Sequence, residues 1–161
     1  MQLDYLRAAL SRVKQQNFKG AVILAVHHPP YTFGKYVTSV VMLKEIDAIC
    51  DEVGVWPHAV LSGHAHNYQR FTRILVKRQI PYVVCGNGGY PPLQKINVDT
   101  TLRTPIAMPG FAQPERGDSV TLDNYDFMTF GYPRVIVDVT QLRIEFIHRM
   151  TGLLRKLRTI S

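Results

Sequence analysis

The stretch Ala21-Val22-Ile23-Leu24-Ala25-Val26-His27-His28-Pro29-Pro30 decides the fold class of this chain of 161 residues. Its six apolar residues do not alternate with polar ones, which is typical of a strand covered on both faces of a sheet. The paired prolines end that strand, because proline has no N–H to donate to a neighbouring strand. Two histidines therefore stand at its carboxyl end, where sheets of α/β proteins collect functional sites.

A second strand with a similar ending follows. Residues 58–62 form a short apolar run that leads into the turn Gly63-His64-Ala65-His66. Apolar residues at helical spacing over 3–13 and 43–53 predict an amphipathic helix before each strand. The order helix, strand, helix, strand predicts an α/β domain with a mainly parallel sheet.

The second of these helices also carries signals at its two ends. Ser39 is a suitable N-cap, and Gly54 is suited to the position just after the last turn.

The second half of the chain has a different character. Residues 68–76 and 80–85 predict a hairpin, and alternating residues over 135–146 predict another. Between them, residues 90–131 are rich in Pro, Gly, Asp and Asn without sustained periodicity, and such a segment is usually functional or mobile. The basic tail, residues 155–158, is expected as a solvated edge strand.

We expect a single domain with three parts. Residues 1–90 are the α/β part that carries the histidine motifs, residues 91–131 are an irregular loop, and residues 132–161 are C-terminal β-hairpins. Cys50 and Cys85 stand far apart in apolar stretches, so both are expected as free thiols of the core.

The composition excludes several classes of protein. A hydrophobic share of 46% can bury a core, so global disorder is not expected. No apolar run approaches the roughly 20 residues that span a bilayer, so no membrane is expected as a partner. The net charge of +7 predicts attraction to anions such as phosphate esters. Nucleic acid is not expected, because no helix has a basic face and no strand interleaves aromatic and basic residues. The compartment stays undetermined.

Three histidines at two strand ends favour a metal site over ordinary polar side chains. His27 follows the first strand, and His64 and His66 follow the second, beside a glycine that lets the backbone turn tightly. Neutral imidazole offers a directional nitrogen lone pair at physiological pH. The spacing alone allows either one metal ion or two neighbouring ones.

Two motifs resemble those of a known family. The residues Val26-His27-His28-Pro29-Pro30-Tyr31 and Gly63-His64-Ala65-His66-Asn67-Tyr68-Gln69-Arg70 resemble the last two motifs of the calcineurin-like metallophosphoesterases, closest to the purple acid phosphatase branch. The turn Cys85-Gly86-Asn87-Gly88-Gly89 also matches that branch. The resemblance covers residues 2–90 well and the final hairpins only loosely.

The resemblance implies a fold, an activity and a cofactor. The fold would be the C-terminal half of a β-sandwich flanked by helices (αββα). The complete enzyme would hold two divalent or trivalent metal ions, Fe, Zn or Mn, that activate a water for the hydrolysis of phosphate mono- or diesters. A phosphate ester would therefore be the substrate.

The resemblance also implies roles for single residues. His27 and His64 would bind one metal ion, and His66 the other, with no catalytic residue beyond the metal ligands. Five further residues are candidates for contact with substrate or support of the ligands, each against an ordinary surface role: His28, Lys35, Asn67, Tyr68 and Arg70.

The family's aspartate-bearing motifs are absent from this sequence. Without a bridging aspartate, nothing offsets the repulsion between two metal ions, and three imidazoles supply only part of either coordination shell. The chain is therefore expected to be a C-terminal portion that is inactive alone. A truncated gene, a misplaced start or half of a two-chain enzyme would each account for it, with an N-terminal segment or a second chain that supplies the carboxylates.

A non-catalytic module is the alternative function. It would hold one zinc ion with His27, His64 and His66, and its basic surface would engage an anionic partner.

Overall fold

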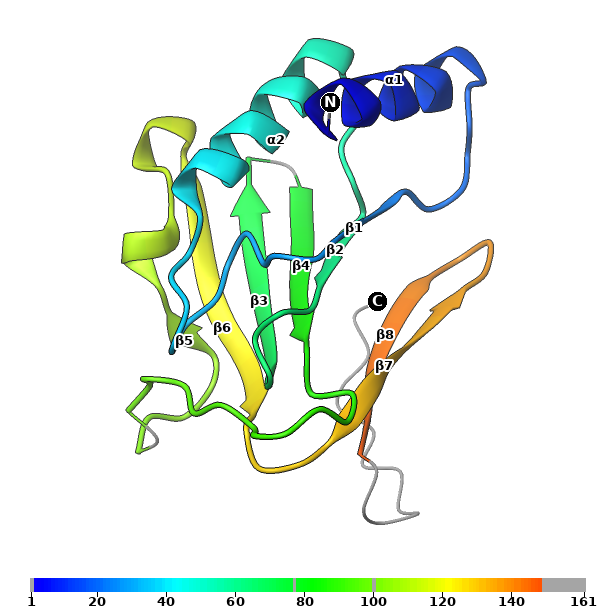
Figure 1. The fold of residues 1–161 in the computed structure, drawn as a ribbon. Helices are drawn as coiled ribbons and strands as arrows, with labels where there is room; N and C mark the ends of the chain where they lie inside the picture. The colour runs from blue at the N-terminus through cyan, green and yellow to red at the C-terminus, as the bar shows by residue number, and fades with distance from the viewer. Residues whose placement is uncertain (1, 77, 100, 149–161) are drawn as a thin grey trace.

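The computed structural model describes residues 2–76, 78–99 and 101–148. These residues form a mixed α/β fold with a core that is mostly sheet (Figure 1). The elements in chain order are α1 (Gln2–Gln15), β1 (Ile23–Val26), α2 (Val40–Val53), β2 (Ala59–Ser62), β3 (Tyr68–Leu75), β4 (Arg78–Cys85), β5 (Ile106–Ala107), the short 3-10 helices η1 (Pro109–Phe111) and η2 (Pro114–Arg116), β6 (Asp118–Asp126), β7 (Gly131–Val137) and β8 (Leu142–His148).

The main sheet has the strand order β1-β2-β4-β3-β6-β5. Only the pairs β1–β2 and β2–β4 are parallel, and the other three pairs are antiparallel. The prediction of a mainly parallel sheet is therefore wrong, while the α/β class holds. The reason lies in the connections, because a short turn such as that between β3 and β4 joins only antiparallel neighbours, and parallel neighbours need a long crossover.

The two helices lie together over one end of the sheet (Figure 1). Leu10 of α1 packs with Ile46, Ile49 and Cys50 of α2 in one buried cluster. The predicted ends of α2 are confirmed: the Ser39 side chain accepts a hydrogen bond from the N–H of Met42, and Gly54 follows the helix with a φ of 76°. Glycine adopts that left-handed conformation at no steric cost.

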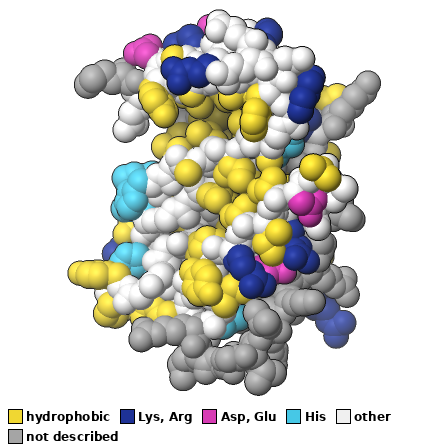
Figure 2. All heavy atoms as spheres, turned by 90° about the vertical axis from the view of Figure 1, so that its right-hand side faces the viewer, with side chains coloured by type: hydrophobic (Ala, Val, Ile, Leu, Met, Phe, Trp, Pro, Cys, Tyr) yellow, Lys and Arg dark blue, Asp and Glu magenta, His cyan; other side chains and the backbone are white. Residues whose placement is uncertain are grey.

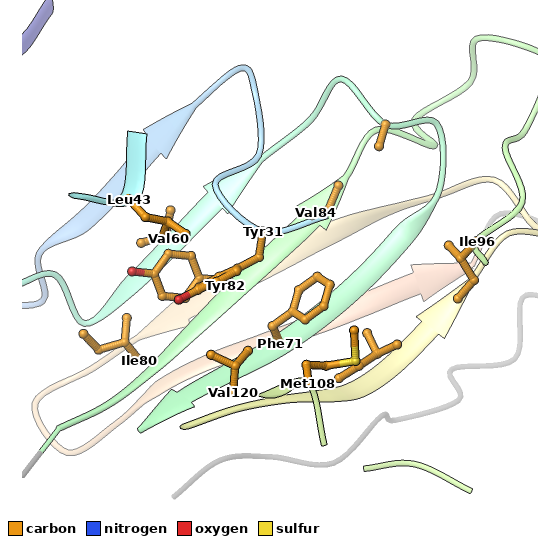
Figure 3. Packing of buried hydrophobic residues seen from close by; sticks show 12 residues of the cluster. Tyr31, Leu43, Val60, Phe71, Ile80, Tyr82, Val84, Ile96, Met108 and Val120 are labelled. Atoms are coloured by element: carbon orange, nitrogen blue, oxygen red, sulfur yellow. The ribbon is translucent and has the colours of Figure 1, made fainter. Parts of the chain in front are cut away.

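The main core lies on one face of the six-stranded sheet. It joins Leu43 of α2 to apolar side chains of β2, β3, β4 and β6. Tyr31, from the loop after β1, is fully buried in it, beside the rings of Tyr82 and Phe71 (Figure 3). That loop is thereby anchored in the core three residues after His28, the second of the two histidines that follow β1.

The predicted C-terminal hairpin is confirmed as β7 and β8, which form a separate two-stranded sheet. Phe146 of β8 stacks on Tyr68 of β3 with ring centroids 4.2 Å apart. Val83 of β4 belongs to the same buried cluster, so this hairpin covers the face of the main sheet opposite to the main core. The predicted tail strand at 155–158 lies outside the described residues.

The segment 91–131, expected to be irregular, contains the nine-residue strand β6. Val120 and Leu122 of this strand point into the core. The alternation of apolar and polar residues is limited to these two positions and breaks at Asn124 and Tyr125, so it is too short to predict the nine-residue strand Asp118–Asp126.

Strand β1 differs from its prediction in its surroundings. It is an edge strand, and Ala25 is exposed rather than covered. No element in the described part of the chain lies beyond it, and an apolar groove of about 860 Å³ opens there between α1, β1 and α2. Hydrophobic side chains gather on this side of the molecule (Figure 2). Neither described helix is long and apolar enough to cross a membrane.

Candidate metal site

The pairing of β1 with β2 brings the histidine motifs together. The two strands are parallel neighbours, with Val26 opposite Ser62, so their carboxyl ends lie side by side. The N–H of Gly63 donates to the carbonyl of His27 at 3.1 Å, which continues the pairing past both strands. Histidines that follow the two strands in the sequence must therefore share one edge of the sheet.

Three imidazoles converge at that edge. Nε2 of His27 lies 3.1 Å from Nδ1 of His64, and the ring centroids of His28 and His64 are 4.1 Å apart. One nitrogen from each of the three rings lies within 4.8 Å of the others. Within the described ranges this is the only group of three or more His, Cys, Asp or Glu side chains with such spacing, and it contains no carboxylate.

The donor set fits a metal ion. Two imidazole nitrogens bound at tetrahedral angles to one zinc ion lie about 3.3 Å apart, close to the separation of His27 and His64. If the third nitrogen lies at the full 4.8 Å from another, it would have to approach that nitrogen by about 1.5 Å to reach the same spacing. A side-chain rotation can supply such a movement. Without a metal, the His27–His64 contact is a hydrogen bond when one of the two nitrogens carries a proton.

His64 is held in the form that binds metals. Desolvation lowers its pKa below the ordinary value of 6.5, and the neighbouring imidazoles of His28 and His27 lower it further. Its imidazole is therefore neutral at physiological pH, with a lone pair free for a ligand bond. Its backbone has a φ of 60°, a conformation that non-glycine residues adopt at a cost of about 1–2 kcal/mol, and the N–H of Ala65 closes the turn on the carbonyl of Gly63 at 2.7 Å.

His66 lies outside the three-histidine group. Its Nδ1 is 3.3 Å from the carbonyl oxygen of Pro92, and its ring meets that of Tyr90 edge to face at a centroid distance of 5.4 Å. The structure thus brings together two of the three expected ligands, His27 and His64. It adds His28, which the sequence predicted only as a candidate for contact with substrate or for support of the ligands. The position of His28 directly after His27 was the sequence signal for its place in the group.

The other expected residues are divided between the site and the core. Lys35 is exposed, and its Nζ lies 5.5 Å from the ring centroid of Tyr36, which in turn lies against His64. Asn67 is buried beside the histidine turn. Tyr68 is buried against Phe146, and that burial raises the pKa of its hydroxyl to about 12. Tyr68 and Arg70 share the face of β3 that turns toward the C-terminal hairpin.

Sequence reasoning missed two residues around the site. The ring of Tyr36 lies over the imidazole of His64 with centroids 4.3 Å apart, and nothing in the sequence marked it. Gln69 is fully buried and bonds to the loop that carries Tyr36. A signal for Gln69 did exist, because it lies two residues before Phe71 on the inward-facing side of the strand. A polar side chain that points inward needs hydrogen-bond partners.

No protein-family model matches this chain, and no curated protein matches it.

Proposed function

We propose that this chain is the histidine-bearing part of a metal-dependent phosphoesterase. The observation that carries the proposal is the convergence of His27 and His64 from the ends of two parallel strands, 3.1 Å apart and without a carboxylate in the group. A metal ion bound there would polarise a phosphate oxygen and lower the pKa of a water molecule.

The surroundings of the site suit a phosphate ester. Lys35 supplies an exposed positive charge near Tyr36 and His64. The net charge of +7 attracts an anionic substrate. His27 and His64 would hold the metal ion as neutral ligands, and the lowered pKa of His64 keeps that form at neutral pH.

The carboxylate ligands would come from a polypeptide segment that docks at β1. Strand β1 has a partner on one side only among the described strands, so alternate backbone groups face the open groove. The groove is lined by apolar residues of α1, β1 and α2 and reaches His27 and His28. A segment added there would complete an αββα sandwich and bring carboxylates to the imidazoles.

A second function is favoured by one specific observation. The group contains His28 and excludes His66, so three imidazoles surround a single point. Such a set suits one zinc ion, with a fourth position left for water or a ligand. The chain would then be a non-catalytic zinc module.

Metal content and variants separate the two functions. The purified chain is titrated with Co²⁺, whose visible absorption reports coordination, and its bound metal is measured by elemental analysis. In the zinc module, one ion binds tightly and His28→Ala releases it, while His66→Ala has no effect. In the phosphoesterase part, the chain alone binds Co²⁺ weakly, and His27→Ala or His64→Ala abolishes this binding. p-Nitrophenyl phosphate is then hydrolysed only when a carboxylate-bearing segment is added to the chain. Turnover by the chain alone would refute the need for that segment, and the absence of any binding by wild type would refute both functions.

A further inference from the structure

The side chain of Gln69 is the centre of a buried polar network next to the histidines. Its exposed fraction is 0%. Its Oε1 accepts a hydrogen bond from the N–H of Phe33 at 2.8 Å, and its Nε2 donates to Oγ1 of Thr32 at 3.3 Å and to Oδ1 of Asn67 at 2.8 Å. The N–H of Phe33 requires an acceptor, so only this orientation of the amide fits.

One branch of the network leads to the histidine turn. Nδ2 of Asn67 donates to the carbonyl of Gln94 at 3.0 Å. Gln94 in turn brackets the backbone of His66: its Oε1 accepts from the N–H of His66 at 3.1 Å, and its own N–H donates to the carbonyl of His66 at 2.9 Å. The turn that carries His64 is thus tied to Gln69 through Asn67.

The other branch leads to the loop after β1. The N–H of Thr32 donates to Oγ1 of Thr38 at 3.2 Å, and that hydroxyl donates back to the carbonyl of Thr32 at 3.1 Å. These two hydrogen bonds close residues 32–38 into a loop. Tyr36 lies within it and places its ring on His64.

We propose that Gln69 is a positioning residue that sets the orientation of the His64 imidazole. One buried amide bonds to both segments that hold this imidazole, the histidine turn on one side and the Tyr36 loop on the other. A side chain of similar shape without hydrogen bonds would leave the N–H of Phe33 and the Oδ1 of Asn67 unpaired in the interior, and both segments would shift to reach water. The inference depends on the proposed function only for its effect on metal affinity.

The test is Gln69→Met, which keeps the length of the side chain and removes its hydrogen bonds. In the metal-free protein, NMR would follow the imidazole protons of His64, which the ring of Tyr36 shifts, and the nuclear Overhauser contacts between the two rings. We expect the variant to lose this shift and these contacts, and to bind Co²⁺ about tenfold more weakly than wild type, as is typical when the support of a metal ligand is removed.

Two further variants keep the proposal falsifiable. Gln79→Met changes an exposed glutamine at the other end of the sheet and should leave the His64 signals unchanged. If Gln69→Met does not fold, Thr32→Val removes one acceptor of the Gln69 amide with little change of shape, and it should weaken the Tyr36–His64 contacts. Wild-type His64 signals in a folded Gln69→Met protein, or in Thr32→Val where Gln69→Met fails to fold, would overturn the proposal. Because these signals are read without metal, the absence of Co²⁺ binding by wild type would refute the proposed function and leave this inference standing.

Discussion

Nε2 of His27 and Nδ1 of His64 lie 3.1 Å apart, although 37 residues separate them in the chain. The parallel pairing of β1 with β2 produces this proximity, because it aligns the ends of both strands at one edge of the sheet. Any change that moves either strand end should therefore alter the distance between the two imidazoles.

Stability should depend on pH through His64. Its pKa in the folded protein is below 6.5, so near that pH the unfolded chain binds more protons than the folded one. The contribution of His64 is complete above pH 6.5 and is lost as the pH falls toward the folded pKa. Urea unfolding of the metal-free protein at several pH values measures it. His64→Asn, which tolerates the left-handed backbone, should remove this part of the pH dependence, and an unchanged profile would contradict the prediction.

Gly86→Ala should disturb the histidine turn. A Cβ at Gly86 would collide with the backbone carbonyl of Ala65, which lies between His64 and His66. Backbone atoms cannot yield as a flexible side chain does, so we expect a loss of about 1–3 kcal/mol in the free energy of unfolding and weaker Co²⁺ binding. Gly88→Ala is the control, since a Cβ there meets no atom within 4 Å. Equal effects of the two substitutions would count against the close approach.

Arg73→Met should destabilise the fold strongly. Arg73 is fully buried, and its guanidinium bonds to both carboxylate oxygens of Asp47 at 2.7–2.8 Å and to Asp118 at 2.7 Å. Its removal takes the guanidinium away from the buried carboxylate of Asp118 and leaves Asp47 with the guanidinium of Arg116, whose Nε lies 3.5 Å from the Asp47 Oδ2. Removing one partner of such a buried ion pair costs about 3–5 kcal/mol. Denaturant unfolding provides the measurement.

A matched control for Arg73 is Arg7, which pairs with Glu52 at 3.0 Å on the surface. Exposed pairs contribute about 0–1 kcal/mol, so Arg7→Met should change the unfolding midpoint little. If both substitutions cost the same, burial does not govern the strength of these pairs.

Both cysteine thiols should be inert in the folded protein. Burial raises the pKa of Cys50 and of Cys85 to about 12, so almost no thiolate exists at neutral pH. We expect Ellman's reagent to label neither thiol in native conditions and both after unfolding in guanidinium chloride. Rapid labelling of the native protein would show that one of them is accessible.

Local pattern was enough to predict much of the fold. The helical spacing and the end signals Ser39 and Gly54 anticipated α2, and alternation anticipated the C-terminal hairpin. These features depend on neighbours a few residues apart, which is why the sequence carries them. Strand β6 was not predicted, because its pairing with β3, rather than its own residue pattern, makes it a strand.

The sequence by itself determined that His27 and His64 follow the ends of two successive strands, because an apolar run followed by prolines or by a glycine turn defines a strand end. Only the tertiary structure decided which imidazoles meet. His28 joins the group and His66 turns to Pro92, while Tyr36 and Gln69 come to lie around the site. Side-chain direction at a strand end depends on the turn that follows and on distant segments packed against it, and no local spacing encodes either.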